Sequence, residues 1–151
     1  MRAYVVPAGC RSTAEIQAVE RPDPRPGPNQ VLVRVRAASL NYKDQAVAAG
    51  VYIGGPLIRD TIPLSDGAGD VVAVGPGVRT LKPGDRVVAT FSQIPPDGSP
   101  AGPKLALGGP LDGMLAELVV CMRTACCRSL AACRTKRPRV CHAPASPHGT
   151  R

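Results

Sequence analysis

Candidate metal ligands are concentrated in the last 31 residues of the chain. Five of the six cysteines lie at or after position 121, and a histidine directly follows the last of them. Zinc prefers thiolate and imidazole ligands, and structural zinc sites usually take them from closely spaced pairs. The five cysteines stand at positions 121, 126, 127, 133 and 141, so no paired C-x-x-C element exists. We therefore do not expect this segment to bind zinc.

The same segment is also strongly basic. It holds seven of the nineteen Lys and Arg residues, and no Asp or Glu follows Glu117. The stretch "RTKRPRV" has the composition of a short patch that contacts nucleic-acid phosphates. However, the segment has no aromatic residue for base stacking and no hydrophobic period. Disorder is therefore the favoured interpretation of residues 121–151, and a nucleic-acid partner is not expected.

The first 120 residues have a different composition. Their twelve basic and eleven acidic side chains give a net charge of +1, whereas the whole chain carries +8. The length is that of one domain. No apolar run approaches the roughly 20 residues that a membrane-spanning helix needs, and the apolar stretch near Met1 is too short for a secretory signal. We expect a cytoplasmic protein without a membrane partner, in which thiols stay reduced.

Short strands separated by Pro and Gly turns dominate these 120 residues. The clearest is "QVLVRVRAASL", in which Val31, Val33 and Val35 alternate with residues of the opposite face. The segment "NYKDQAVAAG" fits a short helix that ends at Gly50. Further strands are expected over residues 1–6, 13–20, 86–91 and 113–120. The segment "PLSDGAGDVVAVGPGV" is glycine-rich and then strongly β before a turn at Gly75-Pro76-Gly77. This pattern predicts a small all-β barrel and lacks the strand–helix alternation of a parallel nucleotide-binding sheet.

Three segments, "VLVRVRAASLNYKD", "PLSDGAGDVVAVGPGV" and "LKPGDRVVATF", follow one another in a characteristic order. Together they resemble the N-terminal GroES-like domain of the medium-chain dehydrogenase/reductases. This superfamily includes zinc alcohol dehydrogenases and zinc-free quinone oxidoreductases. The resemblance implies a GroES-like, partly open β-barrel with a short helix over residues 1–120. Residues 121–151 do not resemble the family and are expected to form a disordered tail.

The resemblance also addresses the catalytic metal. Zinc-containing members carry a Cys where this chain has Asn41, and a His-Glu pair where it has Ser65 and Asp66. Amide and hydroxyl groups are poor zinc ligands, which leaves one carboxylate. No cysteine lies between positions 92 and 120, so the four-cysteine zinc lobe of many relatives is missing. We expect no metal and a zinc-independent branch.

In zinc-free relatives, a hydride passes between a nicotinamide and a quinone, an enone or an alcohol/carbonyl pair. Polar groups near the ring position the reactants and stabilise charge on oxygen. Asn41 and Tyr52, eleven residues apart, match the quinone oxidoreductase pattern, and the resemblance implies that they are the catalytic pair. It implies coenzyme contacts from Asn41, Tyr42, Lys43, Ser65 and Asp66. Simpler interpretations stay open: Lys43 as a solvated helix charge, Asp66 as a turn cap and Ser65 as a strand-end hydrogen bond.

The implied function is NAD(P)H-dependent oxidoreduction of a small carbonyl, quinone or alcohol. The resemblance leaves open whether full-length members form homo-oligomers. No G-x-G-x-x-G opens a helix, because "GAGDVVAVG" leads into a predicted strand. We therefore expect the chain to bind NAD(P)H poorly and to have little or no turnover. Two alternatives are a non-catalytic GroES-like interaction module and a basic-tailed nucleic-acid binder.

The tail has one further interpretation, a frameshift near codon 121. Read two bases later, "KRPRVCHAPASPHG" can encode "EEAASLPCAGVTAW", with third bases chosen freely. That sequence resembles the helical entry to the family's dinucleotide-binding domain. Sequencing the DNA across codons 115–130 tests the hypothesis, which an uninterrupted reading frame would contradict.

Overall fold

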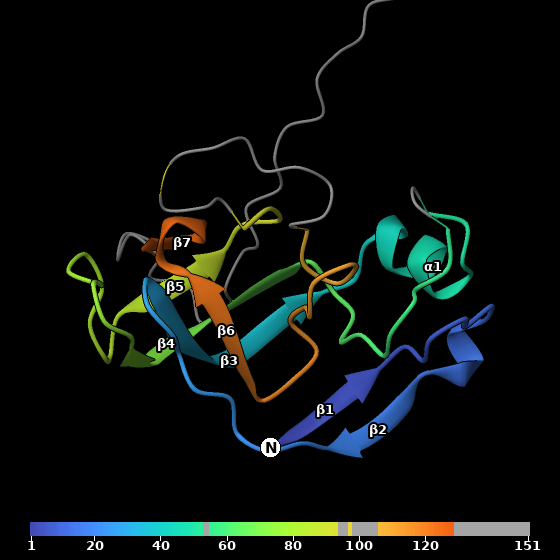
Figure 1. The fold of residues 1–151 in the computed structure, drawn as a ribbon, viewed down its shortest axis with the longest axis horizontal. Coiled ribbons are helices and arrows are strands. Elements are labelled where there is room, and N and C mark those ends of the chain that lie inside the picture. Colours follow the sequence, from blue (N-terminus) through green and yellow to red (C-terminus); the bar gives the residue numbers. More distant parts are fainter. Residues whose placement is uncertain (53–54, 94–96, 98–105, 129–151) are drawn as a thin grey trace, which may run out of the picture.

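The computed structural model describes residues 1–52, 55–93, 97 and 106–128, and these are mostly β (Figure 1). This confirms the expected fold class, a mainly β domain with open sheets and one short α-helix. Its elements are β1 (Arg2–Val5), η1 (Thr13–Glu15), β2 (Gln17–Glu20), β3 (Gln30–Ser39), α1 (Tyr42–Ala48), β4 (Asp66–Val74), β5 (Arg86–Ala89), β6 (Leu118–Met122), η3 (Arg123–Ala125) and β7 (Cys126–Arg128). None of the described helices is long and apolar enough to cross a membrane.

The strands form two antiparallel sheets. Five strands pair in the order β6-β3-β4-β5-β7, and β1 pairs with β2 in a separate ribbon. Figure 1 shows β1 and β2 at the lower right, α1 above them and the larger sheet to the left. The predicted alternation in β3 is confirmed, because Val31 and Val33 are buried in the main core while Arg34 is exposed. The half-buried Val35 packs against the same core.

The short helix has clear start and stop signals. At its N-terminus the backbone N–H of Asn41 donates to Asp44 Oδ2 at 2.8 Å, which satisfies a donor that the helix itself cannot pair. At its C-terminus Gly50 adopts a φ of 70°, a left-handed conformation that ends helices at little cost for glycine. The buried face includes Ala48, which packs with Val6 and Cys10. The predicted helix is therefore confirmed.

Two predicted strands begin later than expected. Residues 13–15 form the 3-10 helix η1, because the Ser12 hydroxyl accepts a hydrogen bond from Ala14 N–H and turns the chain. The strand predicted over residues 113–120 joins the large sheet only from Leu118. The preceding residues pair with β1 instead, through an isolated bridge between Ala3 and Ala116. Local alternation cannot distinguish these two partners.

The prediction of a disordered tail is wrong for residues 121–128. Cys121 lies in β6 and is 1% exposed, because its side chain points into the main core. β7 then pairs with β5, where Cys126 lies opposite Ala89. These small apolar side chains complete the sheet even though cysteine and arginine suggested an unfolded segment. The remainder of the predicted tail, and of the candidate zinc and nucleic-acid patches, lies outside the described residues.

Candidate functional site

Three predicted site residues meet where β3, α1 and β4 come together. The amide Nδ2 of Asn41 donates a hydrogen bond to Asp66 Oδ2, and the Ser65 hydroxyl lies 3.4 Å from the same oxygen. Ser65 is buried, whereas Asn41 and Asp66 are half-buried. A single carboxylate thus contacts both an amide and a hydroxyl. We call Asn41, Ser65 and Asp66 the polar cluster.

Sheet register brings the polar cluster together. Ser39, the last residue of β3, lies directly opposite Asp66, the first residue of β4. Two residues beyond Ser39 the chain reaches Asn41, so its side chain meets Asp66 across 25 positions of sequence. Just before the cluster, Leu64 has a φ of 73° and is buried. A left-handed conformation costs a non-glycine residue about 1–2 kcal/mol, so the surrounding packing must enforce it.

Lys43 interacts electrostatically with Asp66 of the polar cluster and is only 8% exposed. Its ammonium donates a hydrogen bond to the Leu107 backbone oxygen and lies 4.4 Å from the centre of the Phe91 ring. Burial lowers the pKa of Lys43 from 10.5 to about 8, although Asp44 and Asp66 oppose this shift. The interpretation of Lys43 as a solvated helix charge is therefore wrong. Phe91 was not predicted as a site residue; its position at the end of a predicted strand gave no signal.

Asp44 is a second buried charge that the sequence did not reveal. One carboxylate oxygen accepts the N–H of Asn41, while Oδ1 is buried with no hydrogen-bond partner among the described residues. Burial raises the pKa of Asp44, and the Asn41 N–H and Lys43 only partly counteract it. The motif "NYKD" contained a signal for Asp44 as a helix cap, because it stands three residues after Asn41.

The two tyrosines lie apart from the polar cluster. Tyr42 is 84% exposed at the start of α1. Tyr52 is half-buried, and its ring centre lies 5.6 Å from the Lys43 ammonium. Within the described part of the chain no hydrogen bond joins Tyr52 to Asn41. The structure therefore brings Asn41 together with Asp66, and Tyr52 together with Lys43, as two neighbouring pairs.

The donor set of this region suits hydrogen bonding better than metal binding. Over residues 1–52, 55–93, 97 and 106–128, no group of three or more His, Cys, Asp or Glu side chains is placed to hold a metal ion. An amide, a hydroxyl and one carboxylate can orient a polar ligand and hold a proton. The glycine-rich segment that follows is strand β4 and does not open a helix, so it provides no phosphate-binding turn.

The chain matches a known protein family over most of its length. The family model described as the alcohol dehydrogenase GroES-like domain matches residues 27–132. This range contains Asn41, Lys43, Ser65 and Asp66, together with β3 to β7.

Individual relatives agree with this match. A zinc-type alcohol dehydrogenase-like protein of Schizosaccharomyces pombe is 41% identical over 95 residues, which are 62% of this chain and 27% of that protein. The chloroplastic quinone-oxidoreductase QR1 of Triphysaria versicolor is 36% identical over 97 residues, 62% of this chain and 29% of that protein. A solved NAD-dependent alcohol dehydrogenase matches with a TM-score of 0.72 and 33% identity, covering 85% of this chain and 39% of that chain. The chain thus spans less than half the length of these relatives.

Proposed function

Because the chain belongs to the alcohol dehydrogenase GroES-like domain family, we propose that it forms the substrate-binding domain of an NAD(P)-dependent, zinc-independent oxidoreductase. Its substrates would be quinones, enones or small alcohol/carbonyl pairs. The observation that carries this proposal is the polar cluster, in which Asp66 orients the half-buried Asn41 amide. The similarity to both a zinc-type alcohol dehydrogenase-like protein and a quinone-oxidoreductase supports the reaction class.

The polar cluster gives Asn41 a chemical role. One N–H of its amide is held by Asp66, which leaves a second N–H for a ligand. A fixed N–H donor stabilises the negative charge that develops on a carbonyl or quinone oxygen during reduction. Asp66 is then a positioning residue, because it acts through Asn41. Lys43, and Tyr52 through its contact with Lys43, would border the same site.

The donor set also favours a zinc-independent branch. Asn41 and Ser65 supply an amide and a hydroxyl, and zinc takes neither as a preferred ligand. The Asn41 amide is already engaged with the one carboxylate of the cluster. We infer that hydrogen bonds, rather than a metal ion, polarise the substrate oxygen in this protein.

The packing of two glycines argues against a phosphate-binding turn in the glycine-rich segment. Gly69 packs its Cα against the neighbouring strand so closely that an added Cβ would lie 2.1 Å from the Arg34 backbone oxygen. Gly67 similarly lies against the Met114 side chain. These glycines therefore serve strand packing and leave no cradle for a pyrophosphate. We propose that the chain alone binds NAD(P)H weakly and has little or no turnover, and that the coenzyme requires a further domain.

A nuclear magnetic resonance titration tests this proposal. The ¹⁵N-labelled chain is titrated with 1,4-naphthoquinone and, separately, with reduced nicotinamide mononucleotide. We expect saturable shifts of the backbone amides of Asn41, Tyr42, Ser65 and Asp66. The variant Asn41→Leu should lose them, whereas Gln17→Leu, an exposed change on β2, should retain them. Shifts that avoid these amides would contradict the assignment.

Two measurements address the coenzyme and metal parts separately. Oxidation of NADPH by 1,4-naphthoquinone should proceed at the buffer rate when the chain is added; a protein-dependent rate would contradict the need for a further domain. Elemental analysis of chain purified without chelators should find well under one zinc per molecule. Stoichiometric zinc that is lost in Asn41→Leu would overturn the zinc-independent assignment.

A further inference from the structure

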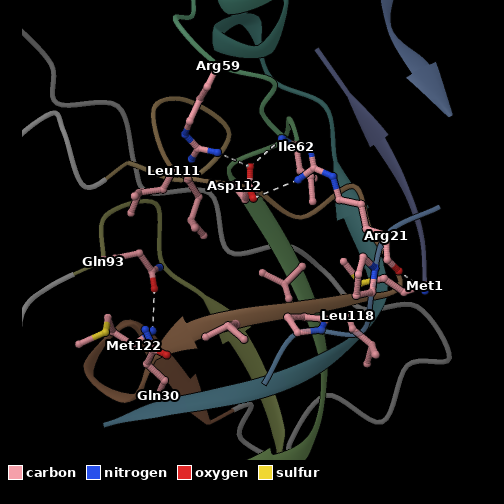
Figure 2. Close-up of a pocket in the computed structure, with 16 residues that line it drawn as sticks. Met1, Arg21, Gln30, Arg59, Ile62, Gln93, Leu111, Asp112, Leu118 and Met122 are labelled. Atoms are coloured by element: carbon pink, nitrogen blue, oxygen red, sulfur yellow. Dashed lines mark hydrogen bonds and ion pairs between the residues drawn. The ribbon is translucent and has the colours of Figure 1, made fainter. Parts of the chain in front are cut away.

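A cavity lies away from the polar cluster, beside strand β6. Its volume is about 600 Å³, within the usual range for ligand sites. Leu118, Val120 and Met122 form one wall of the cavity. Further apolar lining comes from Ile62, Leu107 and Leu111. Figure 2 shows Gln93 near Met122 at one end, and Arg21 with Met1 near Leu118 at the other. We call this cavity the β6 groove.

Strand β6 is an edge strand whose outer side faces the β6 groove. It pairs with β3 on one side, with Val31 opposite Cys121 and Val33 opposite Val119. The flanking bonds, Arg123 N–H to Asn29 O and Val35 N–H to Glu117 O, show that the odd-numbered residues of β6 direct their peptide groups toward β3. In an antiparallel ladder the even-numbered residues then direct theirs away from β3.

Two of the outer N–H groups of β6 have no hydrogen-bond acceptor within residues 1–52, 55–93, 97 and 106–128. No described residue accepts a hydrogen bond from the peptide N–H of Leu118 or Val120. At Met122, however, the side chain of Gln93 supplies an acceptor: its Oε1 lies 2.8 Å from the Met122 nitrogen. A side-chain amide thus takes the place that a peptide group of a neighbouring strand would occupy. As far as the described residues go, this edge pairs with an amide at Met122 and has no acceptor at Val120 and Leu118.

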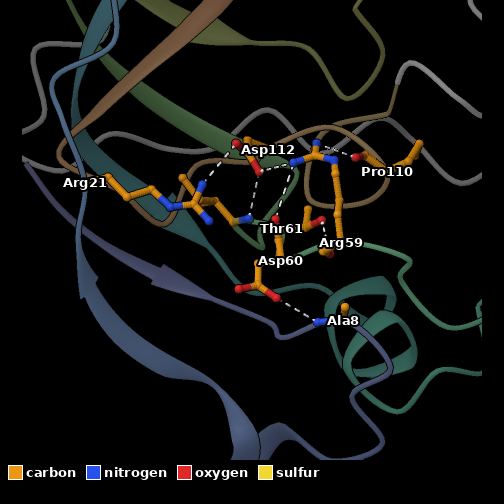
Figure 3. A network of polar contacts seen from close by, with 8 residues as sticks. Ala8, Arg21, Arg59, Asp60, Thr61, Pro110 and Asp112 are labelled. Atoms are coloured by element: carbon orange, nitrogen blue, oxygen red, sulfur yellow. Dashed lines mark hydrogen bonds and ion pairs between the residues drawn. The ribbon is translucent and has the colours of Figure 1, made fainter.

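Charged groups bound the groove opposite β6. The Asp112 carboxylate lies 3.4 Å from Arg21 Nη1 and 3.3 Å from Arg59 Nη1, so two guanidinium groups share one carboxylate (Figure 3). Asp112 also accepts the backbone N–H of Ile62 at 3.0 Å. The side chains of Arg21 and Arg59 are 30% and 50% exposed. This wall therefore carries one net positive charge, with donors that still reach solvent.

We propose that the β6 groove binds an extended peptide segment, which pairs with the outer edge of β6 as an additional strand. Backbone hydrogen bonds to Leu118 and Val120 would provide affinity, as in other cases where a peptide extends a sheet. An acidic side chain would contact Arg21 and Arg59, and apolar side chains at alternate positions would fill the groove. This inference is independent of the proposed oxidoreductase function.

The features of β6 favour a peptide over a small carboxylic acid. A small acid would satisfy the arginines but leave the N–H groups of Leu118 and Val120 unpaired. An exposed edge strand readily templates pairing with another chain, and proteins usually cover or blunt such edges. β6 has no charged or Pro residue to blunt it, since its sequence is LVVCM. An extended polypeptide satisfies the peptide groups, the apolar wall and the positive wall together.

Fluorescence anisotropy tests the proposal with defined probes. The first is a fluorescein-labelled, amide-capped hexapeptide, Glu-Val-Thr-Val-Thr-Val, and the second has the reverse order because strand direction is open. At least one should bind the whole chain saturably, and a Glu-to-Gln peptide should bind about 3–10-fold more weakly. The same peptide N-methylated at alternate amides should bind at least tenfold more weakly. Equal affinity for the N-methylated peptide would overturn the proposal.

Variants of β6 provide the matched comparison. Val120→Pro removes the outward N–H, and proline is tolerated on an edge strand at such a position. It should raise Kd at least tenfold, whereas Val120→Thr, which keeps the N–H, should change it less than threefold. Unchanged binding by a folded Val120→Pro chain would contradict strand addition. Displacement of the peptide by sodium hexanoate with equal effect on both variants would instead indicate a small-acid site.

Hydrogen exchange provides a readout that needs no variant. In the wild-type chain the amides of Leu118 and Val120 should exchange more slowly, by at least tenfold, when the peptide is saturating. The amides of Val119 and Cys121, which already pair with β3, should change much less. Equal protection at odd and even positions, or none, would overturn the proposal even if Val120→Pro failed to fold.

Discussion

The polar cluster and the β6 groove differ in the sequence span of their residues and in the burial of their charged groups. The cluster draws Asn41, Ser65 and Asp66 from adjoining strand and helix ends, within 26 positions of sequence. The groove is lined by residues from Met1 to Met122. Near the cluster, Lys43 and Asp44 are buried, and burial shifts the pKa of each toward its neutral form. At the groove, Arg21 and Arg59 remain partly exposed beside a shared carboxylate.

This difference indicates how each region responds to change. Buried charges cost folding free energy and make stability depend on pH. Partly exposed ion pairs contribute little to stability, so their charges remain available for a ligand. The stability contributed by the cluster should therefore depend on pH and on the residue that caps α1. The groove should instead respond to the loss of backbone hydrogen bonds and to ligand binding.

The largest loss of stability is expected at Gly69 in β4. This strand begins at Asp66 of the cluster and pairs with β3, which in turn pairs with β6. In Gly69→Ala the new Cβ would lie 2.1 Å from the Arg34 backbone oxygen, so β3 and β4 would have to separate. We expect a loss of about 3 kcal/mol or more in the free energy of unfolding, measured with urea. Gly67→Ala is the control, because its Cβ meets the flexible Met114 side chain at 2.7 Å and should cost clearly less. Equal stabilities of the two variants would contradict this packing.

The second-largest loss of stability is expected when the Asp112 carboxylate at the groove is removed. Asp112→Ala leaves the N–H of the buried Ile62 without its acceptor and removes the carboxylate that Arg21 and Arg59 share. We expect unfolding free energy to fall by about 1–2 kcal/mol in urea titrations. Asp112→Asn keeps an oxygen acceptor for Ile62 and should retain at least half of this contribution. If both variants lose stability equally, the charge rather than the backbone contact is decisive.

Stability near the cluster should rise with pH through the titration of Lys43. Its folded pKa of about 8 lies below the ordinary value of 10.5, so between these values the unfolded chain binds more protons than the folded one. When the pH is raised through this window, the unfolding free energy of the wild type should therefore increase more than that of Lys43→Met. Between pH 7.5 and 9.5 we expect an excess of about 1–2 kcal/mol.

Urea unfolding of the wild type and Lys43→Met at both pH values gives this difference directly. Because the cysteines are present in both chains, their titration cancels in the comparison. A difference that is flat or that falls with pH would show that Lys43 is charged and well solvated in the folded protein.

The smallest effect is expected at the helix start. Asn41→Ala removes the side-chain bond to Asp66 and a favourable helix-capping residue. We expect about 1 kcal/mol lower unfolding free energy, measured by thermal or urea unfolding. Asn41→Asp keeps a capping side chain but places a second carboxylate against Asp66, so it should be destabilising at pH 7 and recover at pH 4. No pH dependence in Asn41→Asp would contradict the contact with Asp66.

Several parts of the fold could be predicted because their signals are local. The alternation of β3 follows from its valines, and α1 follows from Asn41, Asp44 and Gly50. Ser12 shortened the second predicted strand through a side-chain bond that alternation does not register. The ordered strand of Cys126–Arg128 was missed because composition describes solubility and does not reveal an available strand edge such as β5.

The candidate site shows the same division between local and tertiary information. By itself the sequence determined which donor types are present: an amide, a hydroxyl and carboxylates where zinc relatives carry Cys, His and Glu. Tertiary structure alone decided that Lys43 is buried, that Tyr52 lies beside it and that the edge of β6 faces a cavity. The physical reason is that side-chain chemistry is fixed residue by residue. Burial, pKa and unpaired peptide groups depend on what distant segments place around each residue.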